Sequence, residues 1–155
     1  RFRRLWPGKL VLKGIMHPDD AIQAAALGVD GLMISNHGAR QLDRAPSPLE
    51  VLPAIAAAVG DRVTLMLDSG IRRGSDAIIA LCLGAKFVFV GRPTLYGVAA
   101  GGIGGAKRAV DIFHDVIDRT MAQIGVCDLR GLSTANLLWN SPADWRRNEP
   151  RGPLG

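Results

Sequence analysis

The chain has 155 residues, of which 48% are hydrophobic and 21% are charged, and its formal net charge is +5. This composition is typical of a globular domain with a sizeable core and excludes an intrinsically disordered chain. No window approaches the roughly 18 apolar residues of a membrane-spanning helix, and no apolar signal core follows the basic N-terminus, so neither membrane insertion nor export is expected.

Four short β-rich runs follow one another along the chain, and each is followed by a segment with the pattern of a helix. The runs cover residues 10–13, 31–35, 63–68 and 87–90. Each is almost continuously apolar, which is typical of strands in a parallel sheet that is covered on both faces. The sequence therefore predicts an α/β fold made of four parallel βα units.

Helix ends are marked by capping residues and glycines. Pro18 opens the first helix, a capping box of Ser47 and Glu50 opens the second, and Ser75 is the expected cap of the third. Pro53 is expected to kink or restart the second helix. The predicted helices are residues 18–27, 47–60, 75–83 and a long C-terminal helix at 105–124.

Four βα units are half the number in a (β/α)₈ barrel. The pattern therefore leaves two architectures open at this point, a small open sheet and one half of a barrel. Beyond Asn140 the composition changes to Pro, Arg, Asn and Gly. We expect residues 1–140 to form the folded unit and residues 141–155 to be a disordered tail.

Polar and charged residues follow each of the four strands. Because parallel strands end at the same edge of a sheet, these residues are expected to meet there, where βα proteins place their active sites. The residues in question are Lys13-Gly14, then Ser35 to Arg40, then Asp68 to Gly74, and finally Gly91-Arg92.

The third and fourth of these strand ends favour a phosphate ligand. Glycine turns, a helix N-terminus, and the guanidinium groups of Arg72 and Arg92 together suit a phosphate dianion. The alternative is that the glycines serve tight turns and the arginines are ordinary surface residues. Nucleic acid is not expected as a partner, because much of the basic excess lies at the two ends of the chain.

The second strand end carries an imidazole and a guanidinium that are three positions apart. His37 and Arg40 could face one small acid, although His37 alone is equally well explained as a hydrogen-bonded turn residue. Lys13 ends an apolar strand, where a cation is costly unless it reaches a ligand or a partner. Cys82 and Cys127 have no ligand spacing, so no metal site is predicted and a reduced compartment is expected.

The segments VLKGI, SNHGARQLD, DSGIRRGSD and GRPTLYG, taken together, resemble a known family. They are similar, in order from about Leu5 to Asn140, to the C-terminal half of the FMN-dependent α-hydroxy-acid dehydrogenases and oxidases, which include glycolate oxidase, flavocytochrome lactate dehydrogenase and mandelate dehydrogenase. The last two segments look closest to the mandelate dehydrogenase branch. The resemblance implies a TIM barrel whose fifth to eighth strands are those seen here.

The resemblance also implies FMN as cofactor and oxidation of an (S)-2-hydroxy acid, such as lactate, mandelate or glycolate, to the 2-oxo acid. His37 would be the catalytic base and Arg40 would bind the substrate carboxylate, while Lys13 would contact the flavin pyrimidine edge. Ala39 lies between His37 and Arg40. If the backbone at this position needs a positive φ, alanine lowers the stability of the fold by an amount on the order of 1 kcal/mol relative to glycine. The residues expected to bind the cofactor are Lys13, Ser35, His37, Arg40, Asp68, Ser69, Gly70, Ile71, Arg72, Gly91 and Arg92.

Half a barrel leaves a sheet edge and an open core, so the enzyme is expected to be incomplete in this chain alone. A rival interpretation is a non-catalytic phosphate- or flavin-binding remnant or partner subunit, and a third is a flavin-free phosphate-binding barrel. The electron acceptor stays open among oxygen, a quinone and a cytochrome, and the family is often homotetrameric. The expected location is cytoplasmic, with peripheral attachment to the inner membrane face as the alternative.

Overall fold

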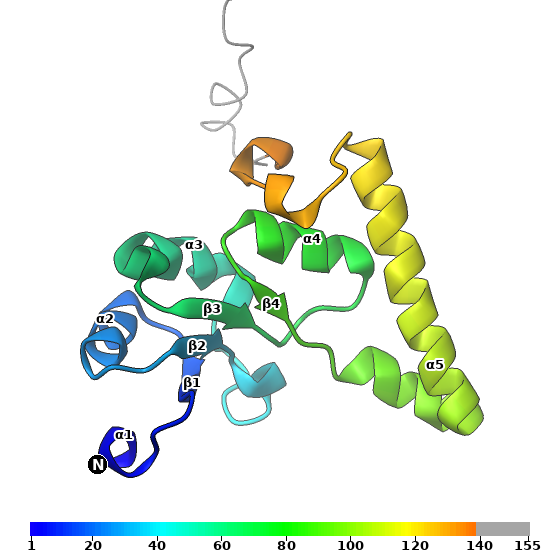
Figure 1. Ribbon diagram of the computed structural model, residues 1–155. Coiled ribbons are helices and arrows are strands. Elements are labelled where there is room, and N and C mark those ends of the chain that lie inside the picture. The colour runs from blue at the N-terminus through cyan, green and yellow to red at the C-terminus, as the bar shows by residue number, and fades with distance from the viewer. Residues whose placement is uncertain (139–155) are drawn as a thin grey trace, which may run out of the picture.

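The computed structural model describes residues 1–138, which form one parallel sheet with helices packed against it (Figure 1). The strands pair in the order β1-β2-β3-β4, all parallel. This confirms the predicted succession of four βα units. The strands are β1 (Val11–Ile15), β2 (Gly31–Ile34), β3 (Thr64–Leu67) and β4 (Phe87–Val88).

Helices α2, α3 and α4 each return the chain to the start of the next strand, whereas α1 precedes β1 and α5 follows the last strand. The helices are α1 (Phe2–Leu5), α2 (Pro18–Ala26), α3 (Pro48–Val59), α4 (Gly74–Cys82) and α5 (Arg92–Gln123), with short 3₁₀ turns η1 (His37–Ala39), η2 (Gly60–Arg62), η3 (Leu129–Gly131) and η4 (Thr134–Asn136). Pro53 lies inside α3 without ending or restarting it, and Leu52 and Ile55 near it are fully buried in the core.

The long C-terminal helix begins earlier than the sequence predicted. α5 starts at Arg92, directly after the last strand, and not at Gly105. Its backbone is non-helical at Gly101 and Gly102, where φ is −159° and 55°, so two helical parts meet at a bend (Figure 1). The glycines around this bend hide the helical pattern of the first part.

The predicted cap of α4, Ser75, is also wrong by two residues, because the N-cap is Arg73. The helix begins at Gly74, so Ser75 lies within its first turn. The Asp76 carboxylate takes the capping role, because it accepts hydrogen bonds from the backbone N–H groups of Arg72 (2.8 Å) and Arg73 (3.0 Å).

The hydrophobic core lies on one face of the sheet. Leu32, Ile34 and Leu67 of β2 and β3 are fully buried against α2, α3 and α4. The opposite face carries the alternate residues of the strands, and there Val11 is 40% exposed and Phe87 is 56% exposed. Within residues 1–138, helices therefore cover one face only, and the expectation of two covered faces is wrong. Apolar residues occupy both faces, so the sequence pattern does not reveal which face is open.

The open face is what half of a barrel would present, because in a closed barrel these residues fill the interior.

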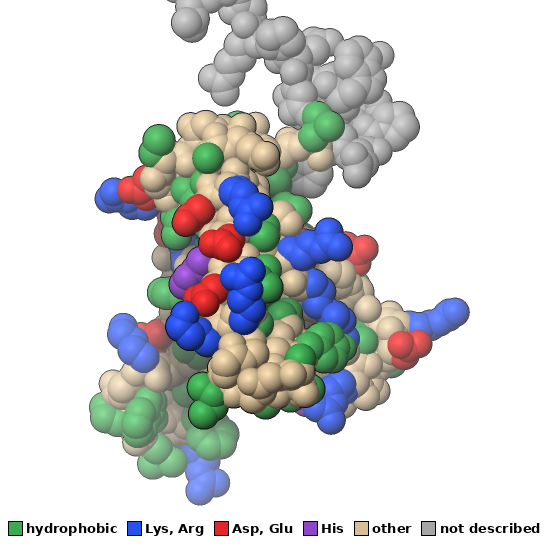
Figure 2. All heavy atoms as spheres, turned by 90° about the vertical axis from the view of Figure 1, so that its right-hand side faces the viewer, with side chains coloured by type: hydrophobic (Ala, Val, Ile, Leu, Met, Phe, Trp, Pro, Cys, Tyr) green, Lys and Arg blue, Asp and Glu red, His purple; other side chains and the backbone are tan. Residues whose placement is uncertain are grey.

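On the outside of the molecule, the exposed side of α5 mixes charges of both signs (Figure 2). Its i,i+4 ion pairs join Lys107 to Asp111 at 2.9 Å and Arg119 to Asp115 at 3.9 Å.

No helix within residues 1–138 combines the length and the apolar character needed to cross a membrane. The expected disordered tail at residues 141–155, and the expected domain end at residue 140, lie outside the described residues.

Candidate functional site

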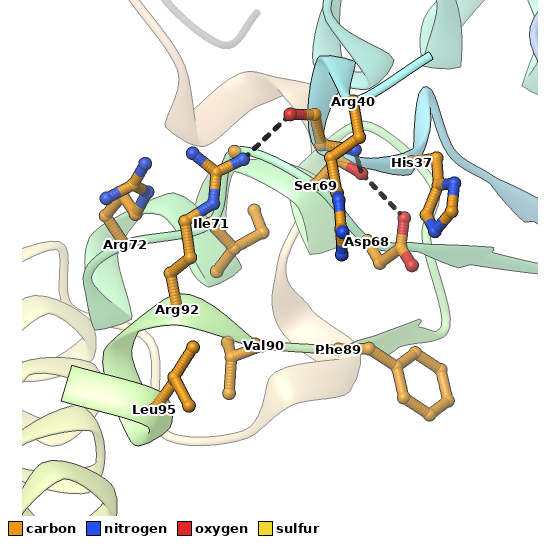
Figure 3. A pocket seen from close by; sticks show the side chains of 13 residues that line it. His37, Arg40, Asp68, Ser69, Ile71, Arg72, Phe89, Val90, Arg92 and Leu95 are labelled. Atoms are coloured by element: carbon orange, nitrogen blue, oxygen red, sulfur yellow. Dashed lines mark hydrogen bonds between the residues drawn. The ribbon is translucent and has the colours of Figure 1, made fainter. Parts of the chain in front are cut away.

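A cavity of about 400 Å³ opens at the C-terminal edge of the sheet (Figure 3). It lies between the segments that follow β2, β3 and β4, as predicted from the polar strand ends. Its lining residues are His37, Gly38, Arg40, Asp68, Ser69, Gly70, Ile71, Arg72, Phe89, Val90, Gly91, Arg92 and Leu95.

Lys13 and Ser35 are the two predicted site residues that do not line this cavity. Lys13 Nζ donates a hydrogen bond to Ser35 Oγ at 2.6 Å and forms an ion pair with Asp68. Ser35 is 3% exposed. Lys13 lies in the middle of β1 and not at its end as predicted, while Ser35 and Asp68 directly follow β2 and β3. The three residues form a polar cluster beside the cavity, and Asp68 joins this cluster to the cavity wall.

Asp68 is ionised in this cluster at neutral pH. Its partial burial alone would raise the pKa, but hydrogen bonds from the Lys13 ammonium and the Ser69 hydroxyl outweigh that effect. The net result is a pKa below the ordinary value of 3.8. A fixed negative charge therefore lies at this end of the cavity, with the Lys13 cation beside it.

The segment after β2 forms a left-handed turn, which we call the His37 turn (residues 37–39). His37, Gly38 and Ala39 have φ values of 55°, 69° and 60°. Asn36 holds this turn, because its Oδ1 accepts hydrogen bonds from the N–H groups of Gly38 (3.0 Å) and Ala39 (3.3 Å), and its Nδ2 donates to the carbonyl of Pro46 (3.1 Å). The sequence analysis missed Asn36, although an asparagine before such a turn is a recognisable signal.

Two further side chains fix the same turn from neighbouring strand ends. Ser69 Oγ accepts a hydrogen bond from the Gly38 N–H at 2.9 Å and donates to Asp68 Oδ1 at 2.9 Å. Arg92 Nη2 donates to the Gly38 carbonyl at 3.0 Å (Figure 3). Both polar groups of the Gly38 peptide are thus bound by residues more than 30 positions away.

His37 and Arg40, which flank this turn, both line the cavity. Figure 3 shows their side chains at the end of the cavity where Asp68 lies. The predicted pairing of an imidazole with a guanidinium at one small hollow therefore fits the geometry. A carboxylate bound in the guanidinium fork of Arg40 would lie within the same hollow as the imidazole.

The other end of the cavity is cationic. Arg72 and Arg92 line it, and within residues 1–138 the Arg72 guanidinium makes no hydrogen bond or ion pair. Arg92 uses one guanidinium nitrogen for the Gly38 carbonyl and keeps further donors. The Asp76 carboxylate binds the N–H groups of Arg72 and Arg73, which precede α4. The two guanidinium groups are the charged donors that an anion would meet here.

An apolar wall completes the cavity, and most of it was not predicted. Its side chains are Ile71, which is buried, and Phe89, Val90 and Leu95 from the segment after β4. Only Ile71 was among the predicted residues. The apolar run at residues 87–90 was interpreted as a buried strand, but β4 ends at Val88 and the next two residues turn toward the cavity.

The predicted residues fit a flavin mononucleotide in outline. A hollow of about 400 Å³ lies within the range of roughly 300–1,000 Å³ that is usual for ligand sites. Guanidinium groups at one end suit a phosphate, the apolar wall suits a ring system, and a lysine at the other end suits a ring that gains negative charge.

Comparison with known proteins gives a consistent picture. The model of a family described as FMN-dependent dehydrogenase matches residues 1–140. An FMN-dependent alpha-hydroxy acid dehydrogenase from Penicillium citrinum is 56% identical over 109 residues, which are 70% of this chain and 27% of that protein. The (S)-mandelate dehydrogenase of Pseudomonas putida is 50% identical over 131 residues, which are 84% of this chain and 33% of that protein.

The structure of an oxidized active mutant of (S)-mandelate dehydrogenase superposes with a TM-score of 0.84 and 48% sequence identity. The superposition covers 88% of this chain and 38% of the other. The four parallel βα units are thus part of a larger α/β barrel in the related structure, and the chain spans about a third of the length of its relatives.

Proposed function

This chain belongs to the family of FMN-dependent dehydrogenases, and we propose that it forms the C-terminal part of an active site that oxidises an (S)-2-hydroxy acid to the 2-oxo acid. One observation carries the proposal. The left-handed turn after β2 brings His37 and Arg40 to the same cavity that Arg72 and Arg92 line at its other end.

The residues divide the site into a cofactor part and a substrate part. Arg72 and Arg92 would bind the phosphate of FMN, while Lys13 would lie near the pyrimidine edge of its ring. When bound, FMN would accept the two electrons of the oxidation. Asp68 would keep the Lys13 ammonium in place, since the two side chains are paired.

The substrate part consists of one base and one clamp. Arg40 would hold the substrate carboxylate in a bidentate hydrogen bond, which fixes the orientation of the 2-carbon. His37 would accept the proton that the acid loses as it is oxidised. Because His37 belongs to the turn and Arg40 directly follows it, the hydrogen bonds that hold the turn would fix the backbone positions of both clamp and base.

The proposal extends to the partners of the reaction. The substrate class is a small 2-hydroxy acid, with mandelate, lactate and glycolate as the candidates. The electron acceptor is oxygen, a quinone or a cytochrome, and aerobic and anaerobic reoxidation of the flavin would separate the first from the others. We propose that the protein is cytoplasmic, with peripheral attachment to the inner membrane face as the alternative. We further propose a homotetrameric assembly, since members of the family often form one.

The first test measures FMN binding by the purified chain through the quenching of flavin fluorescence. Wild-type chain is expected to bind FMN, and the double variant R72M/R92M is expected to lose at least about tenfold in affinity, as charge-assisted hydrogen bonds are removed. Arg108 lies on the exposed side of α5, so R108M is the matched control and should bind as wild type does.

The second step adds (S)-mandelate, L-lactate or glycolate without oxygen and follows bleaching of the flavin. Bleaching by wild type that disappears in His37→Ala, with FMN still bound, supports the enzyme. FMN binding without bleaching would favour the rival interpretation, a non-catalytic flavin-binding module.

A further inference from the structure

The His37 turn and the Lys13 cluster are joined by a closed ring of hydrogen bonds. Lys13 Nζ donates to Ser35 Oγ (2.6 Å), which also accepts from the His37 N–H (3.1 Å). On the other side, the Asp68 partner of Lys13 accepts from Ser69 Oγ (2.9 Å), which accepts from the Gly38 N–H (2.9 Å). Two serines from different strands therefore hold two successive N–H groups of one turn.

Ser69 occupies an unfavourable backbone conformation in this ring. Its φ is 70°, in the left-handed region that glycine adopts freely and other residues adopt at a cost. A glycine at this position would avoid the strain but would have no hydroxyl. The two hydrogen bonds of the hydroxyl are the feature that a serine adds here.

We propose that Ser69 is a positioning residue, which sets the His37 turn relative to the Lys13–Asp68 pair. This inference rests on the proposed function, since it assumes that the turn serves to place His37 and Arg40 at the cavity. As a predicted cofactor-binding residue, Ser69 only lines the cavity. In the role proposed for it now, its hydroxyl acts on the protein backbone. Loss of the hydroxyl would leave the Gly38 N–H held by Asn36 Oδ1 alone and let both side chains move away from their common hollow.

Alanine and glycine at this position separate positioning from stability. Both Ser69→Ala and Ser69→Gly remove the two hydrogen bonds, but only the glycine also relieves the strain at φ 70°. The glycine variant is therefore expected to melt at a higher temperature than the alanine variant. If Ser69 had a purely structural role, amide exchange and ligand affinity would follow the order of the melting temperatures. A positioning role instead predicts that both variants lose amide protection and ligand affinity to the same extent.

The experiment uses the ¹⁵N-labelled chain, because its first readout does not depend on catalysis. Amide hydrogen exchange at Gly38 is expected to become at least tenfold faster in both Ser69 variants. Ser133 is exposed and caps the separate turn η4, so Ser133→Ala is the control and should leave Gly38 unchanged. Unchanged exchange at Gly38 in the Ser69 variants would overturn the inference.

The second readout is an NMR titration of the same samples with phenylglyoxylate, an aromatic 2-oxo acid. Both Ser69 variants are expected to lose affinity for it by the same factor, at least threefold, whatever their melting temperatures. Affinity that is lost with alanine and kept with glycine would overturn the positioning role. If the wild-type chain binds no phenylglyoxylate, the proposed function is contradicted, while the exchange at Gly38 still decides whether Ser69 holds the turn.

Discussion

The Lys13 ammonium and the Asp68 carboxylate form an ion pair that spans β2, because Lys13 lies on β1 and Asp68 directly follows β3, the strands on either side of it. Their side chains are 46% and 23% exposed, so the pair is screened only in part. It closes the polar cluster behind the candidate site. Its removal should therefore be visible in both the stability of the chain and the pH dependence of that stability.

The first prediction concerns Lys13→Met. Since the pKa of Asp68 is lowered in the folded chain, the pair contributes its full stability above the ordinary value of 3.8 and loses it as the pH falls through the lower, folded value. A partly exposed pair of this kind is worth about 1 kcal/mol. Urea unfolding should show this difference between wild type and variant at pH 7 and a smaller one below about pH 4.

A matched control removes a fully surface pair. Lys107→Met breaks the i,i+4 pair with Asp111 on α5 and should cost no more than about 0.5 kcal/mol. A Lys13 variant that is as stable as wild type at pH 7, or one whose deficit grows in acid, would contradict the role given to the pair.

The second prediction concerns Ala39. Its φ is 60°, so replacement by glycine should relieve strain and stabilise the chain by about 1 kcal/mol. The control is Ala122→Gly in the exposed last turn of α5, which should destabilise the chain by up to about 1 kcal/mol. Both changes replace an alanine by a glycine. Opposite shifts in the urea midpoint would therefore establish that the backbone angle determines the effect on stability. Shifts of the same sign would refute the left-handed conformation of Ala39 in solution.

The fold was predictable wherever a short-range pattern carried it. The apolar runs and the glycines between them predicted four parallel strands in the right order, because strand and helix periods differ locally. The start of α5 at Arg92 was not predictable in this way, since the glycines near Gly101 dilute the helical pattern. Which face of the sheet is open depends on what packs against it, and Met33 and Leu32 look alike in a sequence although the latter is fully buried.

The site was predictable in composition but less so in its supports. The rule that parallel strands end at one edge placed His37, Arg40 and Arg72 at one cavity. It could not show that Asn36 and Ser69 hold the turn between them, because those hydrogen bonds depend on backbone angles of the folded chain. Local rules therefore find the groups that line the cavity more readily than the groups that hold their backbone in place.

The third prediction concerns the carboxylate clamp. Arg40→Lys replaces a planar fork by a point charge, so the FMN-loaded protein should show a higher KM and a lower kcat for 2-hydroxy acids. Loss of one bidentate interaction corresponds to roughly 10- to 100-fold in kcat/KM. Arg44→Lys, in an exposed position of the same loop, should leave the kinetics unchanged. Equal kinetics for the Arg40 variant and wild type would remove Arg40 from the substrate part of the site.

The fourth prediction concerns the close approach of the two parts of α5. A side chain at Gly105 would overlap the carbonyl of Gly97, because the bend at Gly101 and Gly102 brings the two backbones together. Gly105→Ala should therefore destabilise the chain by about 1–3 kcal/mol, as overpacking against a rigid backbone does.

The neighbouring Gly104 makes a sharp control for this prediction. A Cβ there would meet no atom within 4 Å, and the residue is helical and exposed. Gly104→Ala should accordingly stabilise the chain by up to about 1 kcal/mol, because alanine has the higher helix propensity. Thermal unfolding followed by circular dichroism would compare the two variants. If both glycines tolerate alanine equally, the two parts of α5 do not pack against each other in solution, and the segment that carries Arg92 and Leu95 to the cavity would be held by β4 alone.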